Sequence, residues 1–309
     1  MSAPAHAPYA GGTQAFAIAL KPLDQEPWIE ADGQLSRYLV EKRRLIGSLR
    51  EEVWNAEADT LAAQREVRDA LVANLLAHPA GNWRRDGDDI VIAGVPDAVA
   101  RVRVAADDPA PLLTASLLMQ EDLCLMRRGE AGWRLAAGSV CFASSWSFKE
   151  KFGQSLDGLH GPVPGYQERL AVRMARIFDN LHVGRPVWRL NWSLYADDAL
   201  HHPHAHGPIR FGVGEEAGDG DWLDNVHVRV ERQTLTRMAQ SGDILFTIRI
   251  HIDPLRALLT HPDRAQLAGG LAQQIAGLDE AQTAYKGLTR HRPQLQRLLE
   301  RMASGEIGV

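Results

Sequence analysis

One histidine lies in a segment whose neighbours would hold an imidazole ring in place. His160 follows Leu159 and precedes the run Gly161-Pro162-Val163-Pro164. Two prolines fix the backbone there in an extended course. An axial metal ligand needs such support, with one ring nitrogen on the metal and the other donating a hydrogen bond. His160 is therefore a candidate metal ligand. Taken alone, these residues favour the plainer alternative, a histidine that caps a loop by bonding to the backbone.

Two predicted strands carry polar side chains on one face only. In the run from Val187 to Tyr195, alternation places Arg189, Asn191 and Ser193 on one face and Leu190, Trp192 and Leu194 on the other. In the run from Val226 to Leu235, the polar face holds His227, Arg229, Glu231 and Gln233. Such a face is either solvated or, if it is covered, paired internally or turned toward a functional cavity.

A third strand-like run is apolar enough for the centre of a sheet. It extends from Ile244 to Ile252 and still carries Arg249 and His251 on the face of Thr247. A charged residue inside such a strand needs a partner, and Glu231 on the preceding strand is a candidate because opposite charges across strands stabilise one another. The alternative to a functional role is a structural ion pair.

Other motifs indicate little chemistry. The run His201-His202-Pro203-His204-Ala205-His206 has four histidines, but no carboxylate or cysteine arrangement completes a known metal site, so we expect adventitious metal affinity. The chain lacks the phosphate-loop, dinucleotide-binding, zinc-protease and nucleophile-elbow signatures. Phosphate-loop, dinucleotide and serine-hydrolase chemistry are therefore poorly supported.

The sequence pattern around these residues predicts an α+β domain. We expect helices over 32–54 and 59–77, a hairpin of strands over 123–128 and 133–143, and a helical insert over 145–181 in which Ser145 caps a short helix. Three strands over 187–195, 226–235 and 244–252 follow, and the tail over 263–302 is mainly helical. This order fits a PAS-like five-stranded antiparallel sheet with a helical insert, plus N- and C-terminal helical extensions.

Length and composition limit the number of domains, the kinds of partner and the cysteine chemistry that the chain can have. The 309 residues suit one domain over 13–302, with a PAS-like core at about 120–253, a disordered arm over 1–12 and a short tail over 303–309. The net charge of -5 argues against nucleic-acid binding and against a basic membrane contact. Cys124 and Cys141 are the only two cysteines, too few for an iron–sulfur cluster, and we expect reduced thiols in a cytoplasmic protein.

Six blocks of residues follow one another along the chain, over roughly residues 20–260. They are Lys21-Pro22-Leu23-Asp24 with Trp28-Ile29-Glu30, Ser145-Trp146 to Lys151-x-Gly153, Leu159-His160-x-Pro162-Val163-Pro164, Arg189-x-Asn191-Trp192, Arg229-Val230-Glu231-Arg232-Gln233-Thr234-Leu235 and Phe246-Thr247-Ile248-Arg249. Taken together and in this order, they resemble the family of haem-dependent oxidative N-demethylases, first described as a domain of unknown function.

The resemblance implies a PAS fold that holds haem b, uses O₂ and removes a methyl group from a small secondary amine such as dimethylamine, releasing formaldehyde. Electrons would come from NADPH through flavin and iron–sulfur carriers on separate reductase subunits. By the same resemblance, His160 would ligate the iron, with Arg189 and Trp192 beside the cofactor. Arg229, Glu231 and Arg249 would be catalytic, and Asn191 would join Glu231 in binding the amine.

Two other functions stay open from the sequence. The chain could be a haem-binding or gas-sensing PAS module without enzymatic activity, although it shows no appended output segment. It could also be a PAS-like binding scaffold without haem, in which case the arginine and glutamate residues of the sheet would be structural.

Overall fold

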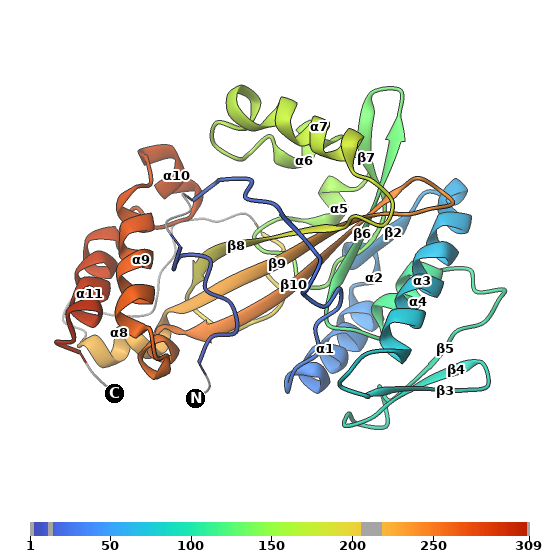
Figure 1. Cartoon of the computed structure of the whole chain (residues 1–309), viewed down its shortest axis with the longest axis horizontal. Helices are drawn as coiled ribbons and strands as arrows, with labels where there is room; N and C mark the ends of the chain where they lie inside the picture. Colours follow the sequence, from blue (N-terminus) through green and yellow to red (C-terminus); the bar gives the residue numbers. More distant parts are fainter. Residues whose placement is uncertain (1–2, 12–14, 205–217, 308–309) are drawn as a thin grey trace.

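A wide antiparallel sheet forms the middle of the molecule (Figure 1). The structure is a computed structural model and describes residues 3–11, 15–204 and 218–307. The seven strands neighbour one another in the order β1-β8-β9-β10-β6-β7-β2. They are β1 (Lys21–Pro22), β8 (Val187–Tyr195), β9 (His227–Arg237), β10 (Ile244–Pro254), β6 (Asp122–Gly129), β7 (Gly132–Ser139) and β2 (Trp54–Ala56). The predicted α+β class and the five long strands are confirmed, and two short edge strands widen the sheet.

The register of the central strands decides which side chains share a face. Asn191 on β8 lies opposite Glu231 on β9, and Glu231 lies opposite Ile250 on β10. Arg232 and Arg249 lie opposite each other. Because directly opposed residues share a face and successive residues alternate, Glu231 is on one face, here called the front face, and Arg249 is on the back face. The predicted pairing of Arg249 with Glu231 is therefore wrong.

The front face is covered by the insert between β7 and β8. This insert consists of α5 (Phe148–Lys151), α6 (Leu156–His160), the π-helical turn η2 (Tyr166–Leu170) and α7 (Ala171–Asn180). Ser147, not Ser145, caps α5 by accepting a hydrogen bond from the backbone N–H of Glu150. Ser145 instead has a positive φ of 63° and shares a hydrogen bond with the hydroxyl of Tyr195. Apolar side chains of the insert pack on Met126, Leu235 and Phe246 of the sheet.

The back face is covered by two separate helical layers. The N-terminal layer packs on Leu123, Leu125 and Leu245, beside a small sheet of three strands. Its elements are α1 (Leu35–Ser48), α2 (Arg50–Val53), η1 (Ala58–Thr60), α3 (Leu61–Leu76), β3 (Trp83–Asp86), β4 (Asp89–Ile92), β5 (Arg101–Arg103) and α4 (Pro111–Ser116). No helix within the described ranges is long and apolar enough to cross a bilayer.

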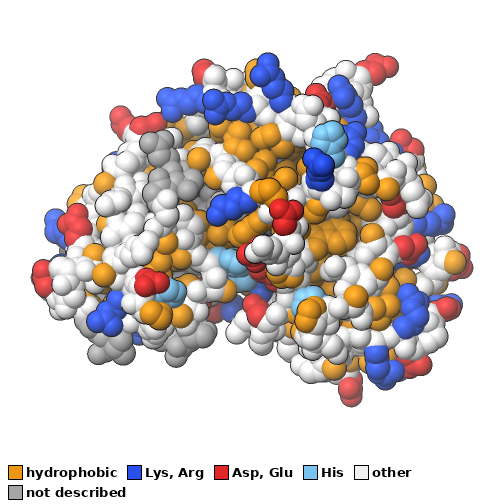
Figure 2. Space-filling model, in the orientation of Figure 1, with side chains coloured by type: hydrophobic (Ala, Val, Ile, Leu, Met, Phe, Trp, Pro, Cys, Tyr) orange, Lys and Arg blue, Asp and Glu red, His pale blue; other side chains and the backbone are white. Residues whose placement is uncertain are grey.

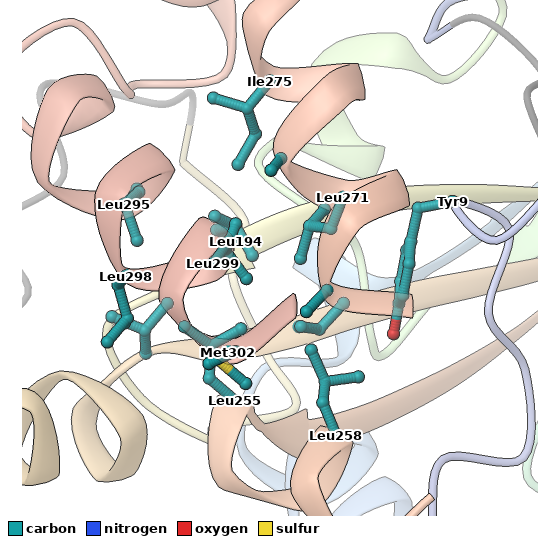
Figure 3. Packing of buried hydrophobic residues seen from close by; sticks show 14 of the residues in the cluster. Tyr9, Leu194, Leu255, Leu258, Leu271, Ile275, Leu295, Leu298, Leu299 and Met302 are labelled. Carbon is teal, nitrogen blue, oxygen red and sulfur yellow. The ribbon is translucent and has the colours of Figure 1, made fainter. Parts of the chain in front are cut away.

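The C-terminal layer packs on the other half of the same face (Figure 3). Its helices surround Leu194 of β8, and the labelled Leu271, Leu299 and Met302 converge on it. The elements are α8 (Asp219–Asn225), η3 (Leu255–Thr260), α9 (Arg264–Ala276), α10 (Glu280–Tyr285) and α11 (Arg292–Ser304). Apolar residues of β8 and β9 that point away from the front face are buried here, since alternation sends them to this side.

The first described residues are held against this layer. The sequence predicts a disordered arm over 1–12, but Tyr9 is 1% exposed and belongs to the C-terminal core. Its backbone passes so close to α9 that a Cβ at Gly270 would overlap the Tyr9 carbonyl oxygen. Glycine at position 270 is therefore needed for this close approach of the Tyr9 backbone to α9. We call residues 3–11 the N-terminal segment.

Replacing Gly270 with alanine tests that contact. Alanine at a helix interior normally stabilises by about 1 kcal/mol relative to glycine, but overpacking against the Tyr9 carbonyl costs roughly 1–3 kcal/mol. We expect Gly270→Ala to lower the free energy of unfolding measured in urea. Gly269→Ala is the matched control, because its Cβ meets only Ala303 at an ordinary 3.6 Å. Equal stabilisation by both variants would contradict the packing described here.

Candidate functional site

A cavity of about 260 Å³ lies between the insert and the front face of the sheet. Figure 2 shows hydrophobic side chains gathered in a hollow in the middle of the molecule, below the insert. The apolar part of the lining comes from both layers and includes Met126, Leu156, Leu159, Met174, Leu235 and Phe246. A small set of polar groups reaches the same space from α6, β8, β9 and the C-terminal tail. An apolar cavity with a few convergent polar groups is the usual form of a cofactor or ligand site.

His160 reaches the cavity from the last turn of α6. Its Nδ1 lies 2.9 Å from the carbonyl oxygen of Leu156, which fixes this nitrogen as the donor. Nε2 has no hydrogen-bond partner among the described residues. The ring also stacks on Tyr166, with centroids 5.1 Å apart. Burial, with further contributions from the charges of Arg189 and Lys151, lowers the pKa of His160, so the ring is neutral at pH 7 and Nε2 carries a lone pair.

Glu231 lies on the floor of the cavity and is held by two amides. Its Oε2 accepts hydrogen bonds from Gln233 Nε2 at 2.7 Å and from Asn191 Nδ2 at 3.4 Å. Within the described residues Oε1 accepts none. Asn191 stands directly across from Glu231 on the neighbouring strand, so the sheet register itself places these two side chains together. The carboxylate is thus oriented, with one oxygen available to a ligand.

Arg189 lines the same cavity, opposite Gln233. Its Nε is buried and lacks a hydrogen-bond partner in the part of the chain that the structure describes. Burial lowers the pKa of this guanidinium, and Glu231 acts in the opposite direction. A buried donor without a partner is costly. The arginine therefore suits an anionic group bound in the cavity.

The C-terminal tail closes one side of the cavity with Tyr285 and Lys286. Lys286 is 4% exposed, and its Nζ donates to the carbonyl oxygen of Trp192 at 2.6 Å. The ammonium also lies 4.4 Å from the centroid of the Trp192 ring. Sequence reasoning missed both residues because they lie at the C-terminal end of α10, where no motif marks them. It missed Phe16, Ile18 and Leu20 as well, although their alternation was a weak signal of a lining segment.

Trp192 and Arg229, both predicted near the cofactor or the substrate, do not line the cavity. Trp192 points to the back face and is buried in the C-terminal core. Arg229 is on the front face, but it donates to Ser144 Oγ and to three backbone carbonyl oxygens. Only Ser144 connects this arginine to the cavity.

Arg249 is separated from the cavity by the sheet. Its Nη2 lies 2.7 Å from Asp32 Oδ2, and its guanidinium stacks over the ring of Tyr38. Arg249 is therefore a buried ion-pair partner on the back face, as the structural alternative in the sequence predicted, with Asp32 in place of Glu231.

The remaining metal and redox candidates lie elsewhere. His201 bonds the carbonyl oxygen of Cys141, and His202 bonds Asp197, so the described histidines of this run form no cluster of three ligands. Position 206 lies outside the described residues. Cys124 and Cys141 are both buried free thiols, and burial raises the pKa of each thiol.

Lys286 gives a pH-dependent contribution to stability. Burial lowers its pKa from 10.5 to about 8, so between these values the unfolded chain binds the extra proton. The free energy of unfolding thus contains a contribution that rises with pH, on the order of 3 kcal/mol in total. Lys286→Met should remove it. The stability of the wild type minus that of the variant, measured in urea, should rise from about pH 8 to about pH 10.5. A difference independent of pH would contradict the burial of this ammonium, and Lys149→Met on the surface is the control.

One family of known proteins matches nearly the whole chain. The match covers residues 19–296, and the family is described as haem-dependent oxidative N-demethylase, alpha subunit-like. The matched range includes the insert, all five long strands and the tail residues that close the cavity. An alpha subunit implies at least one partner subunit. The chain belongs to the haem-dependent oxidative N-demethylase, alpha subunit-like family.

Proposed function

We propose that the cavity binds a b-type haem with His160 as the axial ligand. The observation that carries this proposal is the state of the ring: Nδ1 is fixed on the Leu156 carbonyl oxygen, and Nε2 is left free in an apolar cavity. This is the arrangement in which a neutral imidazole ligates iron. The apolar side chains of the insert and of the sheet would enclose the two faces of the macrocycle.

The buried Nε of Arg189, which has no hydrogen-bond partner among the described residues, supports the same assignment. A haem carries two propionate groups, and an arginine donates strong charge-assisted hydrogen bonds to a carboxylate. Arg189 would hold a propionate and satisfy its buried Nε. Trp192 would act indirectly, because its ring and its carbonyl oxygen hold Lys286 at the wall of the cavity.

We infer that the reaction is the oxidative N-demethylation of a small secondary amine similar to dimethylamine. One amine, one O₂, two electrons and two protons would give the primary amine, formaldehyde and water. The bound haem would supply the chemistry of O₂ activation. The electrons would come from NADPH through flavin and iron–sulfur carriers on separate reductase subunits, which agrees with a chain that has only two cysteines, both buried.

Glu231 would bind and orient the amine. Its Oε2 is occupied by Gln233 and Asn191, so Oε1 would accept a hydrogen bond from the N–H of the substrate and hold the proton of an ammonium form. Arg229 would be a positioning residue, since it fixes Ser144 at the edge of the cavity. Arg249 has no proposed role in the reaction, because the sheet separates it from the cavity.

The order of the elements supports a PAS-like core. β6 and β7 form a hairpin, the helical insert follows, and β8, β9 and β10 complete five adjacent antiparallel strands. We infer that residues of about 120–253 form this core within one domain, with the N- and C-terminal helices as extensions that cover its back face. Haem would lie between the insert and the sheet.

Replacing the ligand tests the haem assignment. With haem supplied during expression, the wild-type protein should show a Soret band with about one haem per chain. His160→Ala should lose most of the haem or shift the band, because no other described imidazole lines the cavity. Added imidazole should restore the wild-type spectrum by entering the vacated position. His182→Ala, at an exposed position after α7, is the control.

Two outcomes would overturn this assignment. A wild-type chain without a Soret band would leave only a scaffold without haem. A Soret band that His160→Ala leaves unchanged would rule out His160 as the ligand.

Glu231→Gln tests the role in amine binding. Loss of a charged hydrogen bond to the substrate costs about 1.5–3 kcal/mol, so kcat/KM for formaldehyde release from dimethylamine should fall roughly 10- to 150-fold. The assay uses haem-loaded protein with NADPH and a surrogate ferredoxin and ferredoxin reductase. The Soret band should persist. Unchanged kcat/KM would exclude Glu231 from the substrate site, and haem binding without formaldehyde from any methylamine would favour a sensing module.

A further inference from the structure

A second cluster of ligand-type side chains lies on the back face of the sheet, away from the haem cavity. His251 points there from β10, on the same face as Arg249 and Arg232. Glu30 reaches it from the segment before α1, and His6 reaches it from the N-terminal segment. The ligand atoms of these three residues all lie within 4.8 Å of one another. Three parts of the chain far apart in sequence therefore place two imidazoles and one carboxylate together.

One carboxylate oxygen faces both rings. Glu30 Oε2 lies 3.1 Å from His6 Nε2 and 3.0 Å from His251 Nε2. A divalent ion about 2.1 Å from each ligand, at angles of about 90–110°, would need neighbouring ligands roughly 3.0–3.4 Å apart. The two distances to Oε2 already match the edges of such a coordination polyhedron.

The other carboxylate oxygen contacts an arginine as well as His6. Glu30 Oε1 lies 3.0 Å from Arg232 Nε and 2.9 Å from His6 Nε2. Arg232 is itself fully buried and anchored to the backbone carbonyl oxygens of Pro27 and Trp28, so it orients the carboxylate as outer-shell partners of metal ligands commonly do. The arginine also places a positive charge nearby, which weakens cation binding, so we expect micromolar rather than tighter affinity.

The cluster is sheltered but open to solvent. The side chains of His6, Glu30 and His251 are 14%, 16% and 9% exposed. An ion could therefore enter and keep water in its remaining positions. Two histidines and one carboxylate with open positions suit zinc, and also ferrous iron.

We propose that His6, Glu30 and His251 bind a divalent transition metal, zinc foremost, which fastens the N-terminal segment to the back of the sheet. His6 precedes the family-matched residues 19–296, whereas Glu30 and His251 lie inside them. The metal therefore links the segment before the family region to the body of the domain. The proposal does not depend on haem binding, because the two sites lie on opposite faces of the sheet.

Zinc titration of the haem-loaded protein, freed of metal with a chelator, tests the site. Isothermal calorimetry should show one equivalent of zinc bound at micromolar concentration. Mutation of a residue that only supports a metal ligand typically weakens metal binding by about 10- to 100-fold. His6→Gln removes one of the three ligands themselves, so we expect this variant to bind zinc about 100-fold more weakly. His6 lies outside every helix and strand of the described chain, so this variant should fold. The Soret band should not change.

Two controls separate this site from adventitious binding. A variant with both His201→Gln and His204→Gln should bind zinc as the wild type does, because the proposal does not use these residues. Zinc should also slow proteolysis of the N-terminal segment in the wild type and not in His6→Gln. Full zinc affinity in His6→Gln, or no stoichiometric zinc in the wild type, would overturn the proposal and leave the cluster as a hydrogen-bonded ion network.

Discussion

The register of β8, β9 and β10 is the constraint on which the rest of the structure depends. Because side chains alternate along each strand, a slip of one residue would exchange the two faces of the sheet. The observed register places Asn191 beside Glu231 on the front face and Arg249 beside Arg232 on the back face. The front face can then close an apolar cavity under the insert. The back face receives two helical layers and the ion pairs of Arg232 with Glu30 and of Arg249 with Asp32.

Buried arginines on the two faces of the sheet differ in their ion-pair partners. On the back face, each buried arginine has a carboxylate partner close by, as Arg249 has Asp32 and Arg232 has Glu30. On the front face, Arg189 forms no ion pair within the described chain, although its Nε is buried and its side chain lines the cavity beside Glu231. A buried charge without an ion-pair partner is costly in a structural core, and such groups gather at functional sites. This difference in ion pairing supports the front face as the ligand-binding face.

Much of this arrangement could be predicted from the sequence, because it depends on local periodicity. The alternation of polar and apolar residues predicted the polar face of β8 and β9, and helical periodicity predicted α1, α3 and α7. The partner of Arg249 could not be predicted, since it depends on register between strands and on a loop that brings Asp32 close. Lys286 and Tyr285 enter the cavity through tertiary packing of the tail alone. Edge strands of two or three residues, such as β1 and β2, carry too little pattern to be recognised.

A crystal structure of the haem-loaded protein would show directly whether the cavity under the insert is the haem site. We predict one haem between the insert and the front face, with His160 Nε2 at bonding distance from the iron and Arg189 on a propionate. Iron bound by another residue, or haem bound outside this cavity, would contradict this prediction.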